Sequence, residues 1–343
     1  MPQGLSRMRL LHIADVHLGR KGRDEDILKQ LQKVVEVCIE ERVDLLLIAG
    51  DLFDRSPVPP PVKRALTEVL QPLRERAIQV VAICGNHDRG AGVGKGGLLF
   101  VEEPTRLTLK EATLHLFPFQ PEGSGREIAQ HPPSRTSPLE IAVCHASYVS
   151  NPRVLADLTE EEALYWPLTS EEVRGLPFDY LALGHYHNPL MWREGEVLCA
   201  YPGTIEPLSF KEEGPRKAFL LSWEGKLKVT EVDLGSQSPY VTLTWRVGLE
   251  VKEEEIPARI RELGKRRGFF RVIVTGLVED RDRLRASVGR PSERVKVDWR
   301  VVDMRQIQGD PLLEGFVKLV KEHRDLSQGI LSRGLSLLGG HVD

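Results

Sequence analysis

The sequence of 343 residues predicts an α/β fold followed by a smaller α+β domain. Over the first 120 residues, short apolar runs alternate with segments of helical periodicity, which is typical of βαβ units. The stretch Gly-Ser-Gln-Ser-Pro-Tyr at 235–240 indicates a break, and a second alternation of strands and helices begins after it. The chain is long enough for more than one domain, and we place the domains at 1–235, 236–305 and 306–343.

Three strands and two helices are predicted at the start of the first domain. The strands occupy 8–15, 43–50 and 78–85, each an apolar run of strand length. Residues 24–41 have apolar side chains at helical spacing, and 57–75 form a helix whose prolines cluster in the first turn, where proline is tolerated. Further short strands are predicted at 107–109, 113–119, 139–145, 179–183, 196–203, 216–225 and 226–234.

The second domain is predicted to run strand, helix, strand, helix, strand. These elements are expected at 241–247, 256–267, 269–276, 280–289 and 294–301. In the last segment, Leu312, Phe316 and Val320 would lie on one apolar face of a helix, which packs either on its own protein or on a partner.

The composition narrows the class of protein. With a net charge of −3, any binding of nucleic acid must depend on local basic patches or on metal ions. No run of apolar residues is long enough to predict a membrane span, and the N-terminal residues lack the features of a secretory signal. We therefore expect a cytoplasmic protein in which the four cysteines are reduced and buried: Cys38, Cys84, Cys144 and Cys199.

Five apolar strands end in side chains that can bind metal ions, and ligands of α/β sheets bind at such strand ends. Asp-Val-His follows the first strand, Gly-Asp the second and Gly-Asn-His-Asp the third. A histidine ends the strand at 139–145, and Gly-His-Tyr-His follows the strand at 179–183. In an extended chain, the last two histidines would face the same side. The candidate residues are Asp15, His17, Asp51, Asp54, Asn86, His87, Asp88, His145, His185 and His187.

These side chains suffice for two metal ions. A two-metal site clamps the attacking and leaving oxygens of a phosphoryl displacement. Such a site needs a carboxylate that bridges both ions, and Asp51 is the candidate because it follows Gly50 at the abrupt end of its strand. Nitrogen and oxygen ligands without thiolate favour manganese, iron or zinc over copper. The six further ligands would be Asp15, His17, Asn86, His145, His185 and His187.

In these motifs the sequence resembles the calcineurin-like metallophosphoesterases, where Asp-x-His, Gly-Asp, Gly-Asn-His-Asp/Glu, His and Gly-His-x-His occur in the same order. The segments LHIADVHLG, AGDLFD, GNHD and YPGTIEPLSFKEEGPRKAFLL are similar to the SbcD nuclease subunits, the bacterial branch of the double-strand-break repair nucleases. The resemblance extends to about residue 235 and is looser over 240–305, which matches the family's capping domain in length and element order. It implies two packed mixed β-sheets flanked by helices.

The resemblance also implies a metal-dependent DNA exonuclease and endonuclease with two divalent ions, manganese first among them. A hydroxide bridging the ions would attack the phosphodiester, while His87 protonates the leaving oxygen and Asp88 orients the His87 ring. Some relatives place a histidine at the position of Asp54 that is linked to exonuclease action, so its role stays open. One ion would be held by Asp15, His17, Asp51 and His187, and the other by Asp51, Asn86, His145 and His185.

The partners that the resemblance implies are DNA, a coiled-coil ATPase of the SbcC type bound by the segment after the capping domain, and a second copy in a homodimer. Two basic clusters are candidates for contacts with the DNA backbone, although each could equally be a solvated helix end. A phosphodiesterase acting on small nucleotides and a scaffold that tethers DNA for the ATPase are the alternative functions. The clusters are Arg20, Lys21 and Arg23, and Lys265, Arg266 and Arg267.

Overall fold

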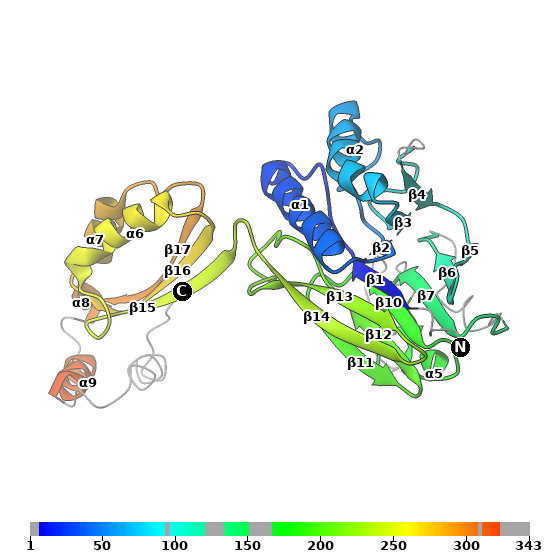
Figure 1. Cartoon of the computed structure of the whole chain (residues 1–343). Coiled ribbons are helices and arrows are strands. Elements are labelled where there is room, and N and C mark those ends of the chain that lie inside the picture. Colours follow the sequence, from blue (N-terminus) through cyan, green and yellow to red (C-terminus); the bar gives the residue numbers. More distant parts are fainter. Residues whose placement is uncertain (1–6, 93–96, 121–133, 151–166, 308–310, 323–343) are drawn as a thin grey trace. The chain divides into compact units, whose positions relative to one another are not determined.

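The computed structural model describes residues 7–92, 97–120, 134–150, 167–307 and 311–322. The chain divides into two compact units (Figure 1). Unit 1 comprises Met1–Leu208 and Gly214–Gln237, and unit 2 comprises Ser209–Glu213 and Ser238–Asp343. The boundary expected at residue 235 therefore falls two residues before the division, whereas the excursion at Ser209–Glu213 has no counterpart in the sequence-based domains.

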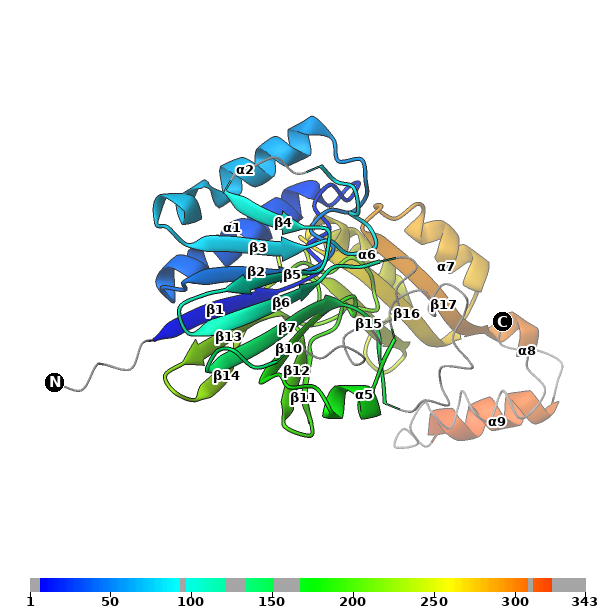
Figure 2. The same cartoon turned by 90° about the vertical axis from the view of Figure 1, so that its right-hand side faces the viewer.

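The first sheet of unit 1 has four parallel strands extended at one edge by two antiparallel ones. Across the sheet, the order is β14 (Leu227–Gly235), β13 (Arg216–Trp223), β1 (Met8–Ile13), β2 (Leu45–Ala49), β3 (Gln79–Ile83) and β4 (Leu98–Val101). Two helices, α1 (Asp24–Glu40) and α2 (Pro60–Glu75), cover one face (Figure 2). Strand β4 was not expected from the sequence.

The second sheet of unit 1 is also mixed, with both of its outermost strands antiparallel to their neighbours. Its order is β11 (Leu190–Glu194), β12 (Val197–Tyr201), β10 (Tyr180–Gly184), β7 (Leu139–His145), β6 (Ala112–Phe117) and β5 (Thr105–Thr108). Its far face packs against the short helix α5 (Ser170–Arg174). The two-stranded pair of β8 (Tyr148–Val149) and β9 (Leu168–Thr169) completes the unit.

Alternate side chains of the central strands serve two hydrophobic cores, as expected for strands that are buried on both faces. Leu11 and Leu46 face the helices, where they join the cluster that contains Ile27 of α1. Leu47 and Tyr180 belong to the cluster between the two sheets. The result is the layered arrangement of helices, sheet and second sheet seen in Figure 2, which agrees with the predicted packing of two mixed sheets.

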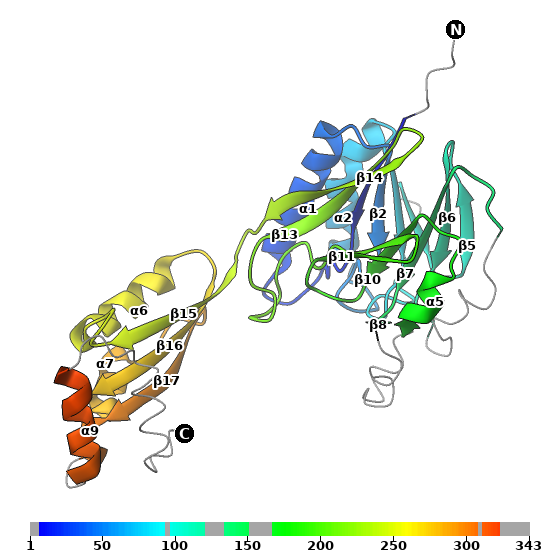
Figure 3. The same ribbon diagram turned by 90° about the horizontal axis from the view of Figure 1, so that it is seen from below.

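Unit 2 contains a parallel three-stranded sheet in the order β15 (Tyr240–Val247), β16 (Phe269–Val278) and β17 (Val295–Asp303). Its connections are α6 (Ile256–Lys265), preceded by a short 3-10 turn at Glu253–Glu255, and α7 (Arg281–Val288), and both helices pack on one face (Figure 3). The excursion Ser209–Glu213 belongs here because the Phe210 ring contacts Tyr240 at 4.8 Å between centroids and lies beneath the guanidinium of Arg271.

The C-terminal segment contains α8 (Met304–Ile307) and α9 (Pro311–Glu322). Of the apolar face expected for the last helix, only the side chain of Leu312 is described, and it is 64% exposed. The tail from residue 323 onward lies outside the described residues. None of the described helices has both the length and the apolar character needed to cross a membrane. All four cysteines are buried and unpaired, as expected.

Candidate metal centre

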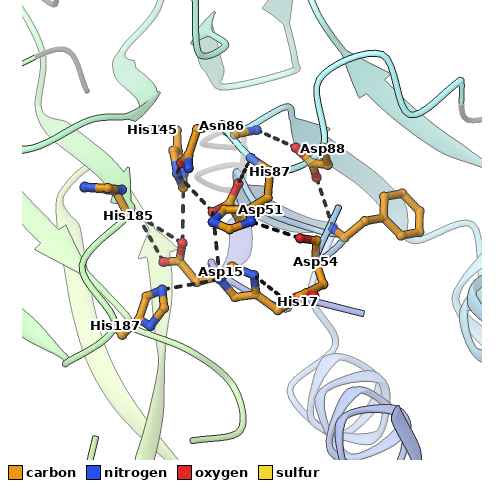
Figure 4. Close-up of polar contacts among 12 residues, drawn as sticks. Asp15, His17, Asp51, Asp54, Asn86, His87, Asp88, His145, His185 and His187 are labelled. Carbon is orange, nitrogen blue, oxygen red and sulfur yellow. Dashed lines mark hydrogen bonds and ion pairs between the residues drawn. The ribbon is translucent and has the colours of Figure 1, made fainter. Parts of the chain in front are cut away.

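The five predicted strand ends meet at one place in unit 1 (Figure 4). Strands β1, β2 and β3 are parallel neighbours, so their carboxyl ends lie at the same edge of the first sheet. Strands β7 and β10 are parallel neighbours in the second sheet, where His145 pairs with Gly184. The loops after these strands bring together Asp15, His17, Asp51, Asp54, Asn86, His87, Asp88, His145, His185 and His187.

Several of these residues have a strained backbone. Asp15, His17, Asp51 and His185 have φ angles of 50°, 51°, 48° and 104°, in the region that non-glycine residues rarely occupy. Each such residue costs roughly 1–3 kcal/mol and persists only where neighbouring contacts enforce it. Here the amide of Asp15 donates to the Gly50 carbonyl, and the amide of His17 donates to the carbonyl of Asp51. The loops after β1 and β2 therefore hold each other in their conformations.

Two glycines allow the sheets to approach each other at the site. A Cβ on Gly50, whose φ is +91°, would lie 2.1 Å from Nδ1 of His145. A Cβ on Gly184 would lie 1.8 Å from the main-chain oxygen of Ala49. Since these contacts are far too short, only glycine fits at either position.

Replacing Gly184 by alanine is expected to lower the free energy of unfolding by more than about 2 kcal/mol and to weaken metal binding, because the added methyl group must push β2 and β10 apart. The measurements are thermal unfolding and titration with Mn²⁺. Gly175→Ala is the matched control, since its nearest neighbour would lie at 3.8 Å and its φ of −89° suits alanine. Equal unfolding temperatures for the two variants would contradict the prediction.

Three groups of side chains could each hold a metal ion. Within each group the potential ligand atoms lie within 4.8 Å of one another. The imidazole of His185 is in none of these groups, and its backbone N–H donates instead to both oxygens of Asp15 at 3.1 Å. The groups are Asp15 with His17 and His187; His17 with Asp51 and His87; and Asp15 with Asp51 and His145.

The chemistry of these donors fits a cation. His145 lies 3.0 Å from the Ala49 carbonyl through Nδ1, and because a carbonyl only accepts, the proton sits on Nδ1. The other nitrogen, Nε2, then faces the Oδ1 of Asn86 at 2.9 Å and a carboxylate oxygen of Asp51 at 3.4 Å. Without a proton, Nε2 would be a third acceptor beside these two oxygens, so the three atoms need a proton or a metal ion between them. The Nε2 atoms of His17 and His187 lie 3.3 Å apart, and these two nitrogens likewise need a proton or a metal ion between them.

Burial and mutual charge shift the ionisation of the site. Burial raises the pKa of Asp15 to about 6, although His145 opposes that rise. Burial also acts to raise the pKa of Asp51, but His145 and His17 hold it well below its ordinary value. For His145 burial acts to lower the pKa, yet Asp51 and Asp15 raise it to about 9. Burial lowers the pKa of His17 to about 4 and that of His185 to about 3. Asp51 is thus the permanent negative charge at the centre of the site.

The predicted partnership of Asp88 with the His87 ring is wrong. The carboxylate of Asp88 is fully buried and accepts from the amides of Gly85 at 2.7 Å and Phe53 at 3.1 Å, so it ties the loop after β3 to the loop after β2. Burial and the charge of Asp51 raise the pKa of Asp88 to about 7. The His87 ring is oriented instead by the main-chain oxygen of Asp54, which lies 2.9 Å from Nδ1.

Asp54 also has a place in the site through its side chain. Its carboxylate accepts from Arg20 at 2.9 Å and lies 3.6 Å from Nδ1 of His17. It therefore faces the ring nitrogen of His17 that points away from the centre, which is where carboxylates commonly orient metal-binding histidines.

The prediction that Arg23 contacts DNA is wrong. Arg23 is buried, and its guanidinium donates to Asp26, to Glu206 and to the carbonyl of Pro207. These contacts anchor the start of α1 to the segment after β12. Its neighbours Arg20 and Lys21 lie at the surface. In unit 2 the side chains of the second cluster are exposed at the end of α6: Lys265, Arg266 and Arg267.

Arg216 and Thr204 had no role in the sequence analysis. The buried guanidinium of Arg216 donates to the His187 carbonyl at 3.1 Å and lies 3.3 Å from the Thr204 hydroxyl. Thr204 belongs to the Tyr-Pro-Gly-Thr segment, which is part of the closer family resemblance. That segment was the feature of the sequence that could have pointed to Thr204. Arg216 therefore supports the loop that presents His187.

Comparison with known proteins agrees with this geometry. The model of the family described as calcineurin-like phosphoesterase matches residues 8–189. Mre11, the DNA double-strand break repair protein of Methanopyrus kandleri, is 27% identical over 303 residues, with 74% of this chain and 62% of that protein covered. Aeropyrum pernix Mre11 is 30% identical over 234 residues (60% and 55%), and the SbcD component of the SbcCD nuclease of Bacillus subtilis is 26% identical over 259 residues (62% and 65%). The chain thus spans less than two thirds of the length of these relatives.

Proposed function

The chain belongs to the calcineurin-like phosphoesterase family, and from that premise we propose that it is a metal-dependent nuclease that hydrolyses DNA phosphodiesters in double-strand-break repair. The observation that carries the proposal is the convergence of histidine, aspartate and asparagine side chains from five strand ends on one centre, whose aspartates Asp15 and Asp51 are buried. The relatives named for break repair or as part of a nuclease support DNA as the substrate.

Two divalent ions, with Mn²⁺ as the preferred metal, would occupy this centre. We assign four ligands to each ion, and both ions share Asp51, which occurs in two of the three ligand groups. When bound, the ions would lower the pKa of a water molecule and offset the negative charge of the phosphodiester. The sets are Asp15, His17, Asp51 and His187, and Asp51, Asn86, His145 and His185.

The protein's own groups would then position and protonate the substrate. The N–H at Nδ1 of His87 donates to the main-chain oxygen of Asp54 and so fixes the ring, which leaves Nε2 directed into the site, 4.0 Å from a carboxylate oxygen of Asp51. In its imidazolium form His87 would donate from Nε2 to a phosphate oxygen and then protonate the leaving oxygen. Asp88 would act only by tying together the two loops that carry Asp51 and His87.

Arg20 is the best-placed contact for the DNA backbone. Its guanidinium is held by Asp54, beside the metal-binding residues, while its side chain remains 43% exposed. Lys21, Lys265, Arg266 and Arg267 would add weaker contacts along the strand.

Replacing Arg20 by alanine is expected to weaken DNA binding several-fold and to reduce the slope of log affinity against log salt concentration by about 1. The measurement is a salt titration of the binding of a labelled duplex. Lys29→Ala is the control, because Lys29 on α1 is equally exposed (42%) and pairs only with Glu25 among the described side chains. An unchanged salt slope would remove Arg20 from the proposed interface.

Unit 2 would control access to the centre, and the segment from residue 306 would bind a coiled-coil ATPase of the SbcC type. A homodimer completes the proposed assembly. Light scattering of the purified chain, alone and with the candidate ATPase, tests both associations.

The experiment that tests the function is incubation of end-labelled linear duplex DNA with Mn²⁺, with Mg²⁺ or with a chelator. We expect shortening of the DNA with Mn²⁺ that the chelator abolishes. A protein that leaves the DNA intact but hydrolyses a small chromogenic diester would instead be a phosphodiesterase of small nucleotides.

A further inference from the structure

An exposed aromatic side chain stands at the edge of the metal centre. Tyr186 lies between His185 and His187 in the sequence, and its side chain is 44% exposed. Its ring centroid is 5.7 Å from that of His185. An exposed tyrosine is unremarkable elsewhere on a protein, but the ring of this one lies beside His185, a proposed metal ligand.

Packing against the ring of Tyr201 holds the Tyr186 ring in place. Tyr201 makes an edge-to-face contact with it at 4.9 Å. Tyr201 is itself fully buried, and its hydroxyl donates to the carbonyl of Ala146 at 2.6 Å. Trp192 stacks on Tyr201 at 5.7 Å between ring centroids with an interplanar angle of 20°. The exposed ring therefore rests on a rigid aromatic base, so little entropy is lost when a planar ligand stacks on it.

We propose that Tyr186 stacks on an unpaired base of the DNA strand, in the nucleotide next to the phosphate that is cleaved. This inference rests on the proposed nuclease function and specifies its substrate as an unpaired strand or a frayed end. Aromatic rings bind every base through its π-face, whatever the sequence. Within a duplex, stacked neighbours cover both faces of every internal base, so the Tyr186 ring can stack only on a base that is unpaired or at an end of the duplex.

The first test compares Tyr186→Ala, Tyr186→Leu and Tyr186→Phe with the wild type on a single-stranded oligonucleotide. We expect kcat/KM to fall about 5- to 100-fold in the alanine variant, the effect of losing one stacked base. Phenylalanine restores the rate, whereas leucine, which is bulky but has no π-face, does not. Titration with Mn²⁺ should give the same affinity for all four proteins. Leu99→Ala, at a site of equal exposure (45%) on β4, should behave as the wild type.

The second test moves one abasic residue through the oligonucleotide. In the wild type, cleavage should slow only when the abasic residue is at one position beside the cleaved bond. The Tyr186→Ala variant should show no further slowing at that position, because the partner of the base is already gone. Multiplicative losses in the combination, or wild-type rates for Tyr186→Ala, would overturn the inference.

The two proposals fail in different ways. If the wild type cleaves none of the DNA substrates, the proposed function is wrong and the stacking role falls with it. If the wild type cleaves DNA while rescue by leucine equals rescue by phenylalanine, the nuclease stands and Tyr186 provides only apolar surface.

Discussion

Replacing Asp51 by asparagine should lower the rate of cleavage of linear duplex DNA by at least about 1,000-fold, because the variant loses the several kcal/mol of charge stabilisation that bound ions would supply. Asparagine keeps the shape of the side chain and an oxygen that can accept from the amide of His87, as Oδ1 of Asp51 does at 3.0 Å. It removes the one negative charge that faces His17, His87 and His145 together. Mn²⁺ titration and DNA cleavage are the two measurements.

The matched control for Asp51 is Asp44→Asn. Asp44 precedes strand β2 and Asp51 follows it, so the same substitution is made at opposite ends of one strand. Asp44 accepts from the amide of Arg9 and lies far from any ligand group. The control should retain cleavage and metal binding. Full Mn²⁺-dependent cleavage by Asp51→Asn would exclude Asp51 as the shared ligand.

Replacing His87 by alanine is expected to slow DNA cleavage by roughly 10²- to 10⁴-fold while Mn²⁺ binding is retained, which is the range for loss of a general acid. We expect the cleavage rate to fall without a loss of Mn²⁺ affinity, because the ring of His87 is oriented by a main-chain oxygen and lies at the exposed side of the site. Single-turnover cleavage, compared with metal titration, measures them.

The leaving group decides whether His87 acts as an acid. A p-nitrophenyl diester releases a weakly basic phenolate that needs no proton, so His87→Ala should lose far less activity on it than on DNA. Equal losses on both substrates would assign His87 to binding of the phosphate alone. A loss of Mn²⁺ affinity would instead make His87 a ligand, as its proximity to His17 and Asp51 allows.

The centre itself could be predicted from the sequence because its residues directly follow the predicted strands. Each motif follows an apolar run, and an apolar run of this length in an α/β protein predicts a buried strand whose carboxyl end lies at one edge of the sheet. The prediction that Asp15, Asp51 and His145 come together therefore required no knowledge of side-chain orientation, only of strand direction.

Side-chain direction was the part that the sequence could not supply. Arg23 and Arg20 stand in the same basic stretch, yet one points into the protein toward Glu206 and the other toward Asp54 at the surface. Asp88 follows His87 directly, but the turn after β3 sends its carboxylate to the backbone amides of Gly85 and Phe53. Neither outcome has a periodic signal, because both depend on loop conformation.

The missed strands have a related cause. Strands β4 and β11 lie at sheet edges and carry exposed apolar side chains such as Leu99 and Leu190. Strand β4 has only four residues (LLFV) and directly follows a glycine-rich stretch, and β11 (LMWRE) ends in two charged residues, so both segments are short for a predicted strand. No strand was therefore predicted at either segment.

The placement of Ser209–Glu213 has a consequence for protein engineering. Because unit 2 is assembled from two stretches of chain, it is not a cassette that can be exchanged between homologues at a single junction. A chain cut after Gln237 would keep Phe210 but lose Tyr240 and Arg271, its ring and cation partners. Such a truncation would leave an aromatic ring without its packing, a source of aggregation. A chimaera would have to transplant the five-residue excursion together with everything beyond Gln237.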